Sequence, residues 1–108
     1  MRRSLNMPRP VAKSLVKLGA DIRTARKKRG FTVAMLADRV GINRETYGNI
    51  ELGRPGVAVG AYAAVLFALG FGTPLGDLVD PRKDDTGLLL DQERMPQRIR
   101  PKKEPQPL

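Results

Sequence analysis

Planar, hydrogen-bonding side chains gather on one short stretch of the sequence, GINRETYGNIELGR at residues 41–54. Apolar anchors mark one side of this predicted helix: Ile42, Tyr47 and Ile50. The other side is crowded by Asn43, Arg44, Glu45, Thr46 and Asn49. An ordinary surface helix carries solvated lysine and glutamate, whereas these amide and guanidinium groups form directional hydrogen bonds. The composition therefore favours a partner that presents hydrogen-bonding groups of its own.

The chain lacks the two residue types most used in catalysis and metal binding. Its 108 residues include no histidine and no cysteine. This removes disulfides, thiolate metal sites, the commonest metal ligand and the usual general base. We therefore expect no enzyme activity, no metal site and no cofactor.

The charge of the chain is positive and unevenly placed. The formal net charge is +9 at pH 7, and a positive field attracts polyanions. Residues 1–13 and 94–108 hold nine Lys/Arg and a single acid, Glu104. Both tails are also proline-rich, so we expect them to stay unfolded alone. They serve either as solubilising segments or as basic arms that touch phosphate or an acidic protein.

No segment has the pattern of a membrane span or a signal peptide. The longest apolar run, residues 57–72, is shorter than the ~20 residues that a spanning helix needs. The N-terminal segment begins with charged residues but has no apolar core. We therefore expect a cytoplasmic, nucleoid-associated protein that does not bind membranes.

Hydrophobic periodicity and capping residues predict an all-α fold of five short helices around one small core. The helices are expected over about residues 13–29, 32–40, 43–52, 59–69 and 73–81. Gly30 ends the first helix, and Thr32 and Asn43 are the expected N-caps of the second and third. A last element over residues 84–95 is predicted as a helix, although Gly87 and three leucines also permit a short strand.

The second and third predicted helices lie about three residues apart, which is the helix-turn-helix arrangement. Ala37 must be small because the next helix crosses close above it, and Gly41 supplies a left-handed backbone conformation. Residues 18–70 resemble the lambda-repressor/Cro-like DNA-binding domain of the xenobiotic-response-element type, through IRTARKKRGFT, LADRVGI and NIELGR. The expected parts are a basic flexible arm (1–12), the helix-turn-helix domain (13–81) and a C-terminal extension with a basic tail (82–108).

This resemblance implies that the third helix enters the major groove of DNA. Four side chains then stand where base readers belong: Arg44, Glu45, Thr46 and Asn49. Arg pairs bidentately with guanine, Asn with adenine, and Glu accepts from N4 of cytosine. Asn43, at the cap of the same helix, belongs to the expected DNA-binding set. The structural alternative is that Arg44 and Glu45 are ordinary solvated charges.

Phosphate contacts are expected from three residues around the motif: Thr32, Arg39 and Arg54. The family often carries glutamine after the Thr cap, where this chain has Val33. Phosphate binding there must rest on Thr32, backbone N–H groups and the helix dipole. Tyr47 replaces the usual aliphatic anchor, and its hydroxyl is expected to reach out toward the DNA backbone.

The resemblance also implies a structural ion pair between Glu51 of the third helix and Arg26 of the first. Removing one partner would leave a partly buried charge, at a cost of ~3–5 kcal/mol if burial is complete.

A second, looser resemblance covers residues 15–100, through LGADIRTARKKRG, GAYAAVLFALG and GLLLDQERMPQRIR. These segments are similar to small HipB-like antitoxins, which are encoded beside HipA-like serine/threonine kinase toxins. The resemblance implies a homodimer that represses its own operon at a pseudo-palindromic operator in double-stranded DNA. It also implies a complex with the kinase, with or without a further small neutralising protein.

Apolar residues beyond the need of a small core mark the expected dimer or partner interface. They are Val65, Phe67, Leu69 and Phe71 near the fourth helix, and Leu88, Leu89, Leu90 and Met95 in the extension. The leading hypothesis is a repressor that is the antitoxin of a HipA-like kinase. The alternatives are a stand-alone or phage-type regulator without a toxin, and a protein-bridging module without DNA specificity.

Overall fold

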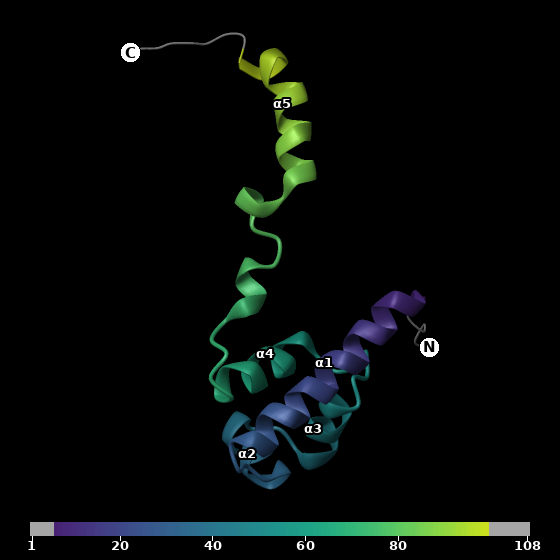
Figure 1. Cartoon of the computed structure of the whole chain (residues 1–108), viewed down its shortest axis with the longest axis vertical. Coiled ribbons are helices and arrows are strands. Elements are labelled where there is room, and N and C mark those ends of the chain that lie inside the picture. Colours follow the sequence, from purple (N-terminus) through teal and green to yellow (C-terminus); the bar gives the residue numbers. More distant parts are fainter. Residues whose placement is uncertain (1–5, 100–108) are drawn as a thin grey trace. The chain divides into compact units, whose positions relative to one another are not determined.

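The computed structural model describes the backbone of residues 6–99 and the side chains of residues 6–94. This part of the chain has five α-helices, two short 3-10 helices and no strand (Figure 1). The α-helices are α1 (Arg9–Lys28), α2 (Val33–Val40), α3 (Arg44–Glu51), α4 (Val59–Ala68) and α5 (Asp85–Ile99). The chain forms two compact units, each with contacts mainly within itself: the first ends at Thr73 and the second begins at Pro74. The predicted all-α class is confirmed.

Helices α1–α4 enclose the hydrophobic core of the first unit. Within it, α3 packs against α1 and α2, and α2 packs against α4 (Figure 1). The core consists of Ile22, Ala25, Leu36, Ala37, Tyr47, Ile50, Tyr62, Val65 and Leu69. Removing these side chains from water is the main favourable contribution to folding. The expected fifth helix of this core, residues 73–81, contributes no buried residue, so four helices form the core.

Helix α1 begins at Arg9, earlier than the expected start near residue 13. Pro8 has an extended backbone at the N-cap, and Pro10 lies in the first turn. Proline suits that position because its fixed φ is already helical and its missing N–H has no partner there. The other end agrees with the prediction, since Gly30 follows the helix with a φ of 72°.

Capping side chains fix the starts of α2 and α3, as predicted. Oγ1 of Thr32 accepts a hydrogen bond from the Met35 amide at 3.0 Å. Oδ1 of Asn43 accepts one from the Thr46 amide at 2.7 Å. Between the helices, Gly41 has a φ of 78°, a left-handed conformation that other residues adopt only at a cost. The turn that joins α2 to α3 is thus set by local sequence.

The second unit differs from the prediction at its first element. The expected compact helix over residues 73–81 is instead a 3-10 helix, Pro74–Asp77, followed by a turn and a second 3-10 helix, Pro81–Lys83. The amides of Leu78 and Asp80 bond three residues back, to Leu75 and Asp77. Gly76 and the proline at each end leave too short a run for α-helical bonding.

The element expected over residues 84–95 is a helix rather than a strand. Asp84 begins α5, because its Oδ1 accepts from the Gly87 amide at 3.0 Å and its carbonyl accepts from the Leu88 amide. The described side chains of this second unit include no buried residue. No described helix is long and apolar enough to cross a membrane.

Candidate nucleic-acid interface

The buried side of α3 determines which of its side chains face outward. Tyr47 and Ile50 are fully buried and belong to the same core as Leu36 and Ala37 of α2. Because residues three and four apart share one face of a helix, Arg44, Glu45 and Asn49 lie off this buried face. Ala37 is buried in this core, and the close crossing of α3 above it stays a prediction.

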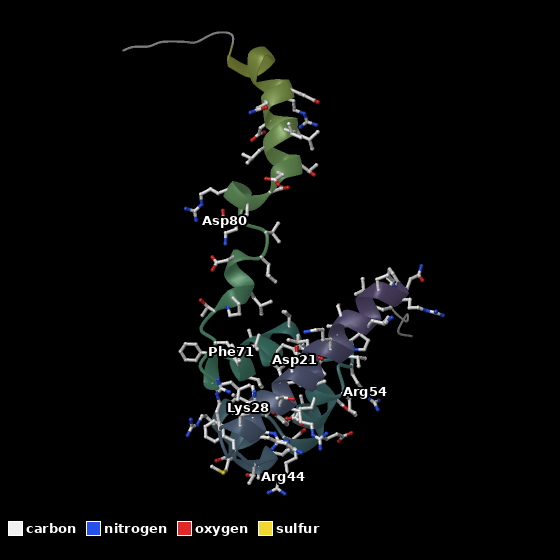
Figure 2. All side chains as sticks on the ribbon, in the orientation of Figure 1. Asp21, Lys28, Arg44, Arg54, Phe71 and Asp80 are labelled. Carbon is white, nitrogen blue, oxygen red and sulfur yellow. The ribbon has the colours of Figure 1, made fainter. Side chains whose placement is uncertain are left out.

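The outward side of α3 carries the predicted base readers. Arg44 and Glu45 are exposed, whereas Thr46 and Asn49 are half-buried. A hollow in the surface lies beside Arg44, lined by residues of α2, the turn and the start of α3: Ala34, Met35, Ala37, Asp38, Ile42, Asn43 and Arg44. Arg44 projects into the open at this end of the unit (Figure 2). The structure thus brings the four expected base readers together on one short helix.

Three side chains form a hydrogen-bonded network behind that surface. Nε of Arg26 donates to Oε2 of Glu51 at 2.7 Å, and Nη2 donates to Oε1 at 3.3 Å. Only 10% of the Arg26 side chain and 11% of the Glu51 side chain are exposed. Nη1 of Arg26 also donates to the Phe31 carbonyl at 2.9 Å. The ion pair implied by the family resemblance is present, and it ties α3 to α1 and to the α1–α2 turn.

Tyr47 is the third member of this network, which corrects the expectation that its hydroxyl reaches out to DNA. The hydroxyl instead donates inward to Oε2 of Glu51. Burial is the main cause that raises the pKa of Tyr47, and the hydrogen bond to Glu51 adds to it. The hydroxyl turns inward because a buried O–H must find an acceptor, and the Glu51 carboxylate lies one turn further along α3.

Two glycines allow α1 and α3 to approach closely, a feature that sequence reasoning missed. A Cβ on Gly19 would lie 2.6 Å from the Ile50 carbonyl oxygen. A Cβ on Gly53 would collide with the backbone of Leu15 and Val16, and Gly53 also has a φ of 72°. The only signal in the sequence is a glycine inside a helix-forming stretch, which by itself does not reveal its neighbour.

The three expected phosphate contacts are all exposed. Thr32 uses its oxygen as a cap acceptor, so its O–H stays available as a donor. The guanidinium of Arg39 lies over the Phe31 ring, 5.5 Å from its centre. The carbonyl of Arg54 accepts from the Tyr62 hydroxyl at 2.9 Å, while its side chain points outward (Figure 2).

The expected interface residues separate into buried and exposed groups. Val65 and Leu69 are core residues with 0% and 3% exposure, so they present no surface to a partner. Phe67 and Phe71 are exposed, and Arg29 lies over the Phe71 ring. Of the expected interface residues in the second unit, Leu88, Leu89 and Leu90 are exposed. The side chain of Met95 lies outside the described residues, as do residues 1–5 and 100–108 of the tails.

The described residues contain no group of three or more His, Cys, Asp or Glu that could hold a metal ion. A family model described as "Helix-turn-helix domain" matches residues 17–80, which is more than half of the chain. The five α-helices are consistent with a lambda-repressor-like fold. The comparison with curated proteins and the comparison with solved structures gave no match.

Proposed function

Because this chain belongs to the helix-turn-helix domain family, we propose that it is a sequence-specific transcriptional repressor that reads its operator with α3. The observation that carries the proposal is the outward polar side of α3, which stands beside an open hollow. Arg44 is assigned to guanine and Asn49 to adenine, while Glu45 accepts from N4 of cytosine. Thr46 completes the set.

Residues around α3 orient the protein on the duplex in this proposal. Arg39, Arg54 and the free O–H of Thr32 bind phosphate oxygens, which fixes register without reading sequence. The N-terminal ends of α2 and α3 add backbone N–H groups and positive dipole ends. Asn43 uses Oδ1 as a cap, so its side-chain NH₂ is free to donate to DNA.

We infer a homodimer because one helix-turn-helix contacts too few base pairs to specify an operator. A single α3 reads few base pairs, and two copies read a pseudo-palindrome with half-site centres about one helical turn, roughly 34–36 Å, apart or a multiple of it. Helix α4 has no charged residue, yet Val59 and Phe67 are exposed on it. We assign the dimer contact to this outer side of α4, with Phe71, in place of the buried Val65 and Leu69.

Arg44→Ala and Arg54→Ala together test base reading against phosphate contact. The probes are a duplex selected by the protein from a random library and a duplex of random sequence. Arg44→Ala should weaken binding to the selected duplex by ~1–3 kcal/mol per half-site, with a smaller loss on random DNA. Arg54→Ala should weaken both to a similar extent. Equal losses from Arg44→Ala on the two duplexes would reduce Arg44 to a phosphate contact and remove the main support for α3 as the reader.

We further propose that this repressor is the antitoxin and co-repressor of a HipA-like serine/threonine kinase. The support is the resemblance to HipB-like antitoxins over residues 15–100, together with three exposed leucines in the extension. Exposed apolar groups this close together are typical of an interaction site. The kinase binds directly or with a separate small neutralising protein, and the complex binds the operator more tightly because it presents more than one dimer.

Co-expression with the kinase encoded beside it, followed by truncation after Pro81, tests this second part. The full chain should co-purify with the kinase, and the truncated chain should not. Capture by the truncated chain would move the contact to residues 1–81. Failure of the full chain to bind any co-encoded kinase would leave a stand-alone or phage-type regulator, and equal binding to all DNA sequences would leave a protein-bridging module.

A further inference from the structure

The outer side of α1 carries a shallow groove that points away from the core. It is lined by Arg9, Ala12, Lys13, Val16 and Lys17. These positions follow the i, i+3, i+4, i+7 spacing of one helix face. Ala12 and Val16 form an apolar floor, and the three cations border it. Val16 is 56% exposed, so this is an apolar surface with a positive rim.

Neither the core nor the DNA-reading surface accounts for these turns of α1. The buried residues of α1 begin only at Gly19. The N-terminal turns, purple in Figure 1, project away from the end of the unit where α2 lies. Arg44 marks that opposite end in Figure 2. The groove is therefore separate from the surface assigned to bases.

Helix α5 carries a face of complementary chemistry. Asp85, Leu89 and Glu93 are spaced four residues apart, so they follow one side of the helix. All three are exposed, and Leu89 is 61% exposed. Among the described residues, neither Asp85 nor Glu93 has an ion-pair partner, and the same holds for Arg9 and Lys13. Lys17 pairs with Asp21 at 2.7 Å, but this pair is exposed and contributes little, so the ammonium can also lie against a further acid.

The spacing of the two faces also agrees. Glu93 follows Asp85 by eight residues, and Lys17 follows Arg9 by the same eight residues. At 1.5 Å per residue, both pairs span ~12 Å along their helix axes. The leucine midway between two acids thus meets the apolar floor of Ala12 and Val16, which lies between the outermost cations of the rim.

We propose that α5 of a second copy of this chain lies in the α1 groove. Leu89 packs between Ala12 and Val16, and the two acids lie against the cations of the rim. The inference rests on the proposed homodimer and names a contact that joins its copies, formed twice in a symmetric pair. Successive helical residues point about 100° apart, so Leu88 and Leu90 face other directions and stay available to a kinase.

Charge reversal in the full-length protein tests the contact, with self-association followed by sedimentation velocity. Arg9→Glu/Lys13→Glu makes the α1 rim acidic, and Asp85→Lys/Glu93→Lys makes the α5 face basic. Each variant alone should dissociate at about tenfold higher concentration than the wild type, because attraction becomes repulsion. Mixing the two variants should restore association, since both contacts then join opposite charges. Both variants keep a net positive charge, so a general attraction between them cannot explain recovery.

Arg23→Glu/Lys27→Glu is the matched control, because it reverses two exposed cations four residues apart at the other end of α1. It should leave self-association unchanged. Wild-type association of the α1 variant, or an equal loss in the control, would overturn the inference and leave the homodimer standing. Loss in both variants without recovery on mixing would show that any pairing lies within one chain, which also overturns it. A monomeric wild type at micromolar concentration would instead refute the homodimer itself.

Discussion

Replacing Glu51 with Gln should destabilise the helix-turn-helix unit by about 3 kcal/mol. The carboxylate accepts two bonds from Arg26 and one from the Tyr47 hydroxyl. The amide removes the negative charge and leaves the Arg26 charge without its partner. Breaking a fully buried pair costs about 3–5 kcal/mol. About a tenth of each side chain here still meets water, so we expect the lower end of that range.

Thermal and urea unfolding of the full chain, followed by circular dichroism at pH 7, measures this change. For a unit of this size each kcal/mol shifts Tm by roughly 4–8 °C, so a fall of roughly 12–24 °C is expected. Glu45→Gln is the matched control, because it makes the same chemical change at an exposed position of the same helix. It should stay within about 0.5 kcal/mol of the wild type.

The double variant Arg26→Met/Glu51→Met distinguishes two causes of the loss: a buried charge left without its partner, and the lost attraction between the two charges. With both charges gone, no buried charge is left unpaired, so the double variant should be more stable than Glu51→Gln. A loss of stability from Glu51→Gln no larger than that from Glu45→Gln would refute the cost of the unpaired Arg26 charge. A double variant less stable than Glu51→Gln would also refute it, because the attraction between Arg26 and Glu51 would then itself stabilise the fold.

Three further predictions concern the α1–α3 contact, the buried phenol and the basic tail. Gly53→Ala should cost about 1–3 kcal/mol more than Gly30→Ala, because both have a φ of 72° but only Gly53 meets backbone atoms; equal losses by urea unfolding would refute this. Folding raises the pKa of Tyr47 above its ordinary value of 10.0. The contribution of Tyr47 to stability is therefore complete below about pH 10 and falls as the pH rises further. Tyr47→Phe should reduce this dependence of stability on pH. If the alkaline slopes are the same, another group titrates. Deleting residues 94–108 should flatten the salt dependence of DNA binding by about 0.9 in log K per decade of salt for each phosphate that the tail neutralises; an unchanged slope would place the tail away from DNA.

Local sequence is enough to predict the parts of the site that local chemistry determines. Thr32 and Asn43 cap their helices through bonds three residues away, and Gly41 adopts the left-handed turn. These signals lie within a few residues of their effect, so α2 and α3 can be placed from the sequence. The early start of α1 escapes prediction because its apolar periodicity begins near Leu15, although Pro10 is itself a helix-start signal.

Features that depend on distant neighbours cannot be predicted in the same way. Helix α4 is apolar on every side, so its sequence does not indicate which side faces the core. The prediction that Val65 and Leu69 belong to an interface is therefore wrong, since both are buried and Phe67 is exposed. The direction of the Tyr47 hydroxyl likewise depends on the Glu51 carboxylate, whose position α1 helps to set.

Helix α3 depends on α1 for its stability and its placement. At eight residues α3 is too short to be helical alone, because isolated helices below about 12–15 residues are marginal in water. The Arg26–Glu51 bond and the small Gly19 and Gly53 hold the end of α3 close to α1. We expect a small change at any of these positions to shift the four side chains that we assign to bases. Substitutions in α1, which carries none of the assigned base readers, are therefore expected to alter which operators this protein binds.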